Sequence, residues 1–117
     1  MQYVYKEERP WGRFFVISDE QNYKIKKIEV EPNKRLSYQF HNKRSEYWII
    51  IEGEGLLVLN DIESKVRQGD TVFIKKTARH RIQNEGDKML VFIEVQTGSY
   101  FGEDDIVRIE DDFNRVK

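Results

Sequence analysis

Cysteine is absent from this 117-residue chain, and proline and histidine occur only twice each. Without cysteine, neither a disulfide framework nor a thiolate zinc site can hold the fold together. No apolar run reaches the length of a membrane span, and the first residues contain no apolar signal-peptide core. The formal net charge of −1 leaves no overall field to attract nucleic acid or an anionic membrane. These absences predict a soluble, cytoplasmic protein that binds neither nucleic acid nor membrane.

The pattern that is present is one of short strands. Apolar and polar residues alternate with period two, and no segment has a helical stripe. An aromatic content of 13% argues against disorder despite the high charge. We expect strands at Arg13–Ile17, Tyr23–Val30, Leu36–Phe40, Glu46–Glu52, Gly55–Leu59, Ile62–Val66, Asp70–Ile74, His80–Asn84 and Met89–Thr97.

The segments between these strands are rich in turn residues, and Asn60-Asp61 predicts a tight hairpin. So many short strands predict an all-β barrel or sandwich whose edges are closed or covered. The length suits one domain, residues 1–117, with its own core. The acidic tail from Gly102 to Lys117 is expected to form a short turn of helix.

The two histidines lie in segments suited to a metal site. Gln39 and His41 would share one face of a strand, Glu46 follows across a short turn, and His80 arrives from a distant segment. Neutral imidazole, carboxylate and amide oxygen together suit one divalent ion such as zinc, manganese, iron(II), cobalt or nickel. The alternative is that both histidines are ordinary core or turn-flanking residues, since most histidines bind no metal.

The spacing around these residues resembles the two motifs of the cupin family. The first reads Asn33-x5-Gln39-x-His41-x4-Glu46-x6-Gly53, and the second reads Gly69-x5-Lys75-x-Thr77-x2-His80-x3-Asn84. Asn33, Gln39, Lys75 and Thr77 replace residues that are usual in the motifs. The resemblance implies a single cupin (jelly-roll) barrel with a short tail.

A narrower resemblance runs from Arg9-Pro10-Trp11-Gly12 to about Arg115. The segments Leu36-Ser37-Tyr38-Gln39 and Glu94–Arg108 resemble the C-terminal isomerase domain of type II phosphomannose isomerases. This implies interconversion of mannose 6-phosphate and fructose 6-phosphate through an enediolate, feeding polysaccharide or nucleotide-sugar synthesis. It also implies that Gln39, His41, Glu46 and His80 hold the metal. The guanylyltransferase domain to which that domain is often fused has no counterpart in these 117 residues, so we expect no guanylyl transfer.

Three departures from that family concern the site. The family usually has histidine where this chain has Lys43 and Tyr47, and a proline-rich approach where this chain reads Lys75-Lys76-Thr77-Ala78-Arg79. We expect these changes to weaken metal binding or to alter the anionic sugar that is recognised.

Basic residues cluster near both motifs and are candidates for binding a phosphate. Arg79 and Arg108 suit phosphate best, because a guanidinium group donates two parallel hydrogen bonds. Glu46 and Arg108 are the candidate catalytic residues, with Glu94 or Tyr47 as further candidates for the base. The full basic set is Lys34, Arg35, Lys43, Arg44, Lys75, Lys76, Arg79 and Arg81, of which Lys75, Lys76 and Arg79, together with Arg108, are assigned to the substrate phosphate.

Other assignments compete with these. The acidic runs Glu103-Asp104-Asp105 and Glu110-Asp111-Asp112 are expected to be solvated, and Trp11, Trp48, Phe73 and Phe92 to pack in the core or in a homodimer interface. The chain could instead be a non-catalytic cupin that binds a sugar or nucleotide sugar as an accessory subunit. A third alternative is another metal-dependent cupin reaction, such as epimerisation or dioxygenation.

Overall fold

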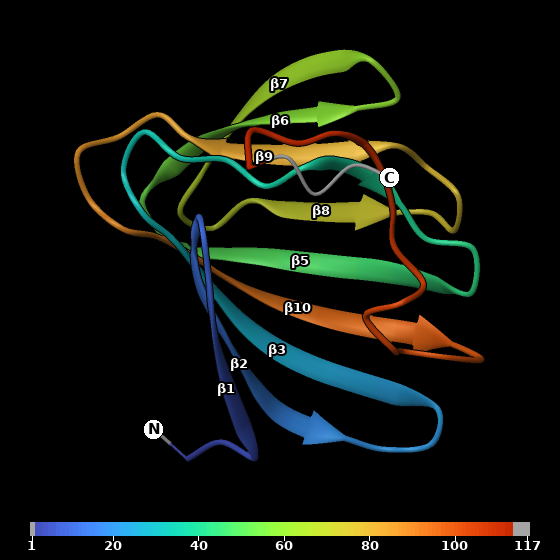
Figure 1. Cartoon of the computed structure of the whole chain (residues 1–117). Coiled ribbons are helices and arrows are strands. Elements are labelled where there is room, and N and C mark those ends of the chain that lie inside the picture. Colours follow the sequence, from blue (N-terminus) through green and yellow to red (C-terminus); the bar gives the residue numbers. More distant parts are fainter. Residues whose placement is uncertain (1, 114–117) are drawn as a thin grey trace.

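The computed structural model describes residues 2–113, which form eleven strands in two antiparallel sheets. The larger sheet runs in the order β1 (Tyr5–Arg9), β2 (Gly12–Asp19), β3 (Tyr23–Val30), β10 (Leu90–Gly98), β5 (Arg44–Glu52) and β8 (Thr71–Ile74). The smaller sheet runs in the order β11 (Val107–Glu110), β4 (Tyr38–Phe40), β9 (His80–Asn84), β6 (Glu54–Leu59) and β7 (Ile62–Arg67). Figure 1 shows the two sheets as facing layers, with β6, β7 and β9 above β10, β3 and β2. The all-β prediction is confirmed.

All nine expected strands are present, with shifts of up to two residues at their ends, and two strands were not expected. Strand β1 contains Lys6-Glu7-Glu8 and strand β11 is short and mostly exposed, so neither has the apolar alternation that marks a half-buried strand. Both lie at the edge of a sheet, where one row of neighbours is missing and charged residues are favoured. The tail was expected to be helical, but its described part up to Phe113 contains β11 and no helix.

The predicted hairpin at Asn60-Asp61 is confirmed. Leu59 pairs with Ile62 across the turn, and both central residues have positive φ angles, 49° and 70°. Such angles belong to the type I′ turn, whose twist matches that of the two strands it joins.

The inward face of the larger sheet is apolar along one half and charged along the other. On β5 the inward residues are Arg44 and Glu46, followed by Trp48 and Ile50, and all four are buried. Strand β10 runs in the opposite direction and repeats the division, with Leu90 and Phe92 in the apolar half and Glu94 and Gln96 in the charged half. The apolar half is the hydrophobic core, in which the rings of Trp48 and Phe92 lie 4.5 Å apart. The charged half lines one end of the barrel.

Among the described residues, no helix is long and apolar enough to cross a membrane.

Gly98 determines how closely β10 can approach the start of β5. A methyl group at this position would overlap the carbonyl oxygen of Lys43, and its φ angle of 149° is one that residues with a side chain rarely adopt. We predict that Gly98→Ala lowers the free energy of unfolding by about 3 kcal/mol, because the strand that carries Arg44 and Glu46 must shift. In the control Gly86→Ala, the new methyl group would meet its nearest neighbour at an ordinary 3.5 Å. Equal losses in urea unfolding of the two variants would contradict this account.

Candidate active site

Three potential metal ligands from three segments meet inside the barrel. His41 directly follows β4, Glu46 lies on the inward face of β5, and His80 begins β9. The register brings His80 opposite Gln39, the last inward residue before His41. One ligand atom from each of His41, Glu46 and His80 lies within 4.8 Å of the others, and all three side chains are almost fully buried.

Hydrogen bonds orient this group. The Nδ1 atom of His80 lies 2.9 Å from the carbonyl oxygen of Ala78, so it carries the proton and leaves the lone pair of Nε2 facing Glu46 Oε1 at 3.8 Å. The Trp48 indole N–H donates to Glu46 Oε1 at 3.0 Å. The Nδ1 atom of His41 lies 3.6 Å from Glu46 Oε2.

The pKa shifts favour neutral imidazoles around an ionised carboxylate. Burial lowers the pKa of His41 from 6.5 to about 3, although the negative charge of Glu46 opposes that shift. Burial lowers the pKa of His80 in the same way. For Glu46, burial alone would raise the pKa, but the positive charge of the adjacent Arg44 holds it below its usual value.

The chemistry of this group fits a divalent cation. Neutral imidazole nitrogen and ionised carboxylate oxygen are ligands of zinc and its neighbours. The buried Nε2 of His80 has no hydrogen-bond partner within the part of the chain that the structure describes. A buried lone pair without a partner is costly, and a bound metal ion would remove that cost. The side-chain oxygen of Gln39 accepts from the Ser37 hydroxyl at 3.3 Å and could be a fourth ligand.

Arg44 contacts two of the three residues in this group, Glu46 and His41. Its Nε donates to Glu46 Oε2 at 2.9 Å, and its Nη2 lies 2.9 Å from His41 Nε2, which must accept because guanidinium only donates. The sequence placed Arg44 in the basic set near the first motif, but its alternation with Glu46 on β5 turns it into the barrel. Any cation bound between His41 and Glu46 therefore replaces contacts made by this guanidinium group.

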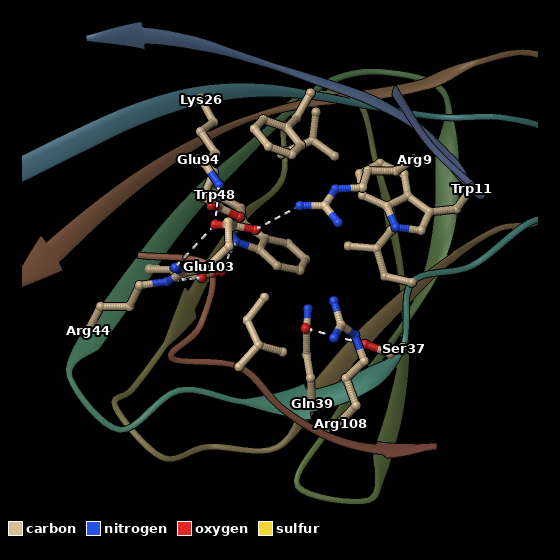
Figure 2. Close-up of a pocket in the computed structure, with 15 residues that line it drawn as sticks. Arg9, Trp11, Lys26, Ser37, Gln39, Arg44, Trp48, Glu94, Glu103 and Arg108 are labelled. Carbon is tan, nitrogen blue, oxygen red and sulfur yellow. Dashed lines mark hydrogen bonds and ion pairs between the residues drawn. The ribbon is translucent and has the colours of Figure 1, made fainter. Parts of the chain in front are cut away.

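A small cavity of about 50 Å³ opens beside this group. Figure 2 shows Arg9, Lys26 and Arg44 on one side of it, with Gln39 and Arg108 on the other. Glu94 lies in its wall opposite Lys26 and Trp48 in the register, and it accepts a hydrogen bond from Gln96 at 2.5 Å. Burial and the nearby charge of Glu46 raise the pKa of Glu94. The lining residues are Arg9, Trp11, Phe14, Lys26, Ile28, Leu36, Ser37, Gln39, Arg44, Glu46, Trp48, Glu94, Glu103, Ile106 and Arg108.

The basic residues of the cavity differ from most of those that the sequence suggested. Of the eight residues in the predicted basic set, only Arg44 lines the cavity, and Arg108 joins it from β11, opposite Gln39. Lys75 and Lys76 are exposed, and Arg79 donates to Asp61 at 2.9 Å outside the cavity. The assignment of these three to the phosphate stays a prediction that the cavity does not support.

Arg9 and Lys26 line the cavity but were not among the candidate site residues predicted from the sequence. Lys26 shares the inward face of β3 with Ile28 and Val30, so the period-two pattern contains a usable signal. An inward lysine next to two fully buried apolar residues is rare unless it is paired. Arg9 offers no such signal, because β1 was not expected to be a strand.

Two of the family departures lie away from the ligands. Tyr47 is on the outer face of β5, 48% exposed, with its ring centroid 4.8 Å from that of Phe73. The ammonium group of Lys43 lies 5.1 Å from the centre of the Tyr100 ring. Both side chains are exposed and lie outside the group of His41, Glu46 and His80, and the expectation that these substitutions weaken metal binding or alter the sugar that is recognised stays a prediction.

The first acidic run was expected to be solvated, and this is wrong for two of its members. Glu103 lines the cavity, and its carboxylate accepts from Lys26 at 2.8 Å. Asp105 is buried and accepts from the backbone N–H groups of Asn42 and Lys43 at 3.2 Å and 2.9 Å. The charge run resembled a solvated loop because its partners lie far away in the sequence.

Comparisons with known proteins define the class and then the family. A crystal structure of a protein with a double-stranded β-helix domain from Klebsiella pneumoniae subsp. pneumoniae MGH 78578 is similar, with a TM-score of 0.70 and 20% identity over 75% of this chain and 77% of that one. The fold is thus the cupin barrel. The family model described as "Mannose-6-phosphate isomerase C-terminal" matches residues 1–111. The chain belongs to this family.

Two curated relatives are much longer than this chain. The xanthan biosynthesis protein XanB of Xanthomonas campestris pv. campestris (strain B100) is 40% identical over 111 residues, which are 95% of this chain and 24% of that protein. The mannose-1-phosphate guanylyltransferase ManC of Salmonella typhimurium is 37% identical over 108 residues, 92% of this chain and 22% of that protein. This chain therefore spans about a quarter of the length of these relatives.

The buried histidines predict a pH-dependent stability for the metal-free protein. The unfolded chain takes up a proton on each histidine below about pH 6.5, whereas burial keeps the folded imidazoles neutral, so acid favours unfolding. Glu94 has the opposite effect on stability. Because its pKa is raised in the folded state, the folded protein binds more protons than the unfolded chain above pH 4.5, so acid favours folding through this group. In metal-free Glu94→Gln protein, we predict that the free energy of unfolding falls between pH 7 and pH 5, and that His41 accounts for about 2 kcal/mol of this loss.

Urea unfolding at the two pH values measures this loss. His41→Asn in the same background should make the loss about 2 kcal/mol smaller, because one of the two titrating groups is removed. A stability that stays level or rises toward pH 5 would show that the imidazoles are not held neutral.

Proposed function

We propose that this barrel is a metal-dependent phosphosugar isomerase that interconverts mannose 6-phosphate and fructose 6-phosphate for polysaccharide or nucleotide-sugar synthesis. The observation that carries the proposal is the buried group of His41, Glu46 and His80 at a cavity lined by Arg9, Lys26, Arg44 and Arg108. Membership of the mannose-6-phosphate isomerase C-terminal family supports the reaction, and xanthan biosynthesis by the Xanthomonas relative supports the pathway.

We assign each group of residues a role that follows from its chemistry. His41, Glu46 and His80, with Gln39 beside them, would hold one divalent ion, which supplies a Lewis acid for the sugar oxygens at the reacting carbons. The cationic side chains of the cavity would bind the phosphate of the sugar. Arg108 is one of them, as the sequence predicted. Arg44 is close enough to both groups to stabilise negative charge that develops on the sugar oxygens.

Glu94 is the best placed group for moving the proton between the two carbons. It lines the cavity, whereas Tyr47 faces away and Glu46 already accepts hydrogen bonds from Arg44 and Trp48. The Gln96 amide group donates a hydrogen bond to one Glu94 oxygen and so orients the carboxyl group. The site is thus consistent with proton transfer by Glu94 to and from a bound sugar.

We assign isomerisation, and not guanylyl transfer, to this barrel, because the match covers only 22% of the Salmonella guanylyltransferase. The partner is a phosphorylated sugar, and the cytoplasm is the compartment that we propose. A second function, sugar-phosphate binding without catalysis, is favoured by one observation. Arg44 bonds to two of the three ligand groups and could take the place of the metal ion.

Metal content and turnover of mannose 6-phosphate, measured on the same samples, separate the two functions. We predict close to one divalent ion per chain, identified by elemental analysis, and measurable formation of fructose 6-phosphate. His80→Ala and Gln39→Ala should lower metal content and reduce turnover by about 100-fold or more. Gln83→Ala, on β9 but outside the cavity lining, is the control and should leave both unchanged. Folded protein that binds mannose 6-phosphate but neither retains metal nor turns it over would establish the binding function instead.

We also propose that the protein is a homodimer through the outer face of the larger sheet. Tyr47, Ile49, Ile51 and Phe73 are 45–50% exposed there, at the outermost strand β8 and its neighbour β5. These side chains present on the order of 400 Å² of apolar surface, about half of the roughly 800 Å² that each partner buries in a standard interface. A second copy is the partner that supplies an equal apolar face.

Charge placed in this face should separate the subunits. We predict that Phe73→Glu shifts the mass measured by light scattering from dimer to monomer, because the new carboxylate would be buried against Tyr47. Ile62→Glu, at a 71% exposed position on β7 in the other sheet, is the matched control and should remain dimeric. A monomeric wild-type protein at micromolar concentration would contradict the proposal.

A further inference from the structure

Glu103 lies among three cations that come from three different strands. Its carboxylate is 2.8 Å from the Lys26 ammonium group on β3 and 3.7 Å from guanidinium nitrogens of Arg9 on β1 and Arg44 on β5. Figure 2 shows these side chains approaching Glu103 from different directions. Lys26 is 3% exposed and also lies over the Phe14 ring at 4.2 Å, so its position is fixed.

Arg9, Lys26 and Arg44 together form a cradle for an anion, and a carboxylate satisfies this cradle only in part. The Nη1 atom of Arg44 is buried, lies 3.7 Å from Glu103, and has no hydrogen-bond partner among residues 2–113. A phosphate monoester carries about two negative charges and three acceptor oxygens, against one charge and two oxygens for a carboxylate. The cradle therefore matches a phosphate group better than it matches the side chain that fills it.

The cavity beside the cradle is also too small for the proposed substrate. A volume of about 50 Å³ holds roughly four water molecules. A hexose phosphate has several times as many non-hydrogen atoms, so part of the lining must move before it can enter. Glu103 is the lining residue best suited to move, because its side chain is one-third exposed and belongs to the connection between β10 and β11.

The connection is anchored on both sides of Glu103. On one side Phe101 is buried. On the other, the Asp105 carboxylate accepts hydrogen bonds from the backbone N–H groups of Asn42 and Lys43. Between these anchors lie Gly102, Glu103 and Asp104, of which Asp104 accepts from the Tyr100 hydroxyl at 2.5 Å. A rotation of these three residues would carry the carboxylate out of the cavity without moving the anchors.

We propose that Glu103 is an internal substitute for the phosphate group of the ligand, held by Arg9, Lys26 and Arg44 until a phosphate replaces it. Residues 102–104 act as the switch that carries it out and opens the cavity. The inference rests on the proposed function for the identity of the ligand, and it adds the phosphate subsite and the group that competes for it.

Binding of inorganic phosphate, followed by calorimetry on the full chain, tests the competition without requiring turnover. Removing the competing charge in Glu103→Gln should tighten phosphate binding by about tenfold, whereas Lys26→Met should weaken it at least about tenfold while keeping its packing on Phe14. Glu63→Gln changes the net charge equally at an exposed position on β7, outside both the lining and the switch, and should stay within about twofold of wild type. Phosphate affinity that is unchanged or weaker in folded Glu103→Gln overturns the proposal, as does equal tightening in Glu63→Gln.

Hydrogen exchange of the wild-type protein supplies a measurement that needs no variant. Saturating phosphate should speed amide exchange in residues 102–104 and leave β3 and β5 unchanged, because only the switch is released. Slower or unchanged exchange in that segment contradicts the switch. These results are independent of catalysis. Turnover without competition at Glu103 would sink only this inference, and competition without turnover would sink only the isomerase.

Discussion

The structure depends on the ion pairs that allow charged side chains to face inward at one end of the barrel. Strands β3, β5 and β10 each have an inward face that changes from apolar to charged partway along its length. An isolated charge buried in this way would cost several kcal/mol, so each must find an opposite charge or a hydrogen bond. Arg44 pairs with Glu46 and Gln96 donates to Glu94 along the same strands, whereas Lys26 pairs with Glu103 from the connection between β10 and β11. The apolar half of the same strands forms the core and fixes the register of the strands.

Arg44 links the two parts of this charged end. One edge of its guanidinium group contacts His41 and Glu46, and its remaining nitrogen points toward Glu103. A metal ion among the histidines and a phosphate in the cradle would therefore both compete for the position of Arg44 or for its partners. The two sites are close enough that one small phosphosugar could contact both. This proximity is the physical reason for treating them as one active site.

The sequence predicted the strands from local spacing, and it predicted the meeting of His41, Glu46 and His80 from that spacing together with the resemblance to the cupin motifs. Alternation in Tyr23–Val30 and Glu46–Glu52 fixes the strands, and the intervals between Gln39, His41 and Glu46 follow from which face of a strand each residue occupies. The hairpin at Asn60-Asp61 was predictable for the same reason, since its turn is determined by adjacent residues. Edge strands β1 and β11 could not be predicted in this way, because their residues have little apolar alternation.

The anion cradle could not be predicted from local spacing. Arg9, Lys26, Arg44 and Glu103 come from four segments, and only the strand order brings them together. Charge near a motif in the sequence was a poor guide, because Lys75 and Lys76 precede His80 yet point to the surface. Inward alternation was a better guide. Lys26 and Arg44 both occupy positions whose neighbours two residues away, Ile28 and Glu46, are buried.

X-ray absorption spectroscopy of the protein loaded with one divalent ion per chain tests the central claim most directly. The account predicts a first shell of nitrogen and oxygen with the multiple scattering of two imidazole rings, reduced to one ring in His80→Ala. A shell without imidazole, or one that His80→Ala leaves unchanged, would show that the ion binds elsewhere and that the buried group of His41, Glu46 and His80 is not a metal site.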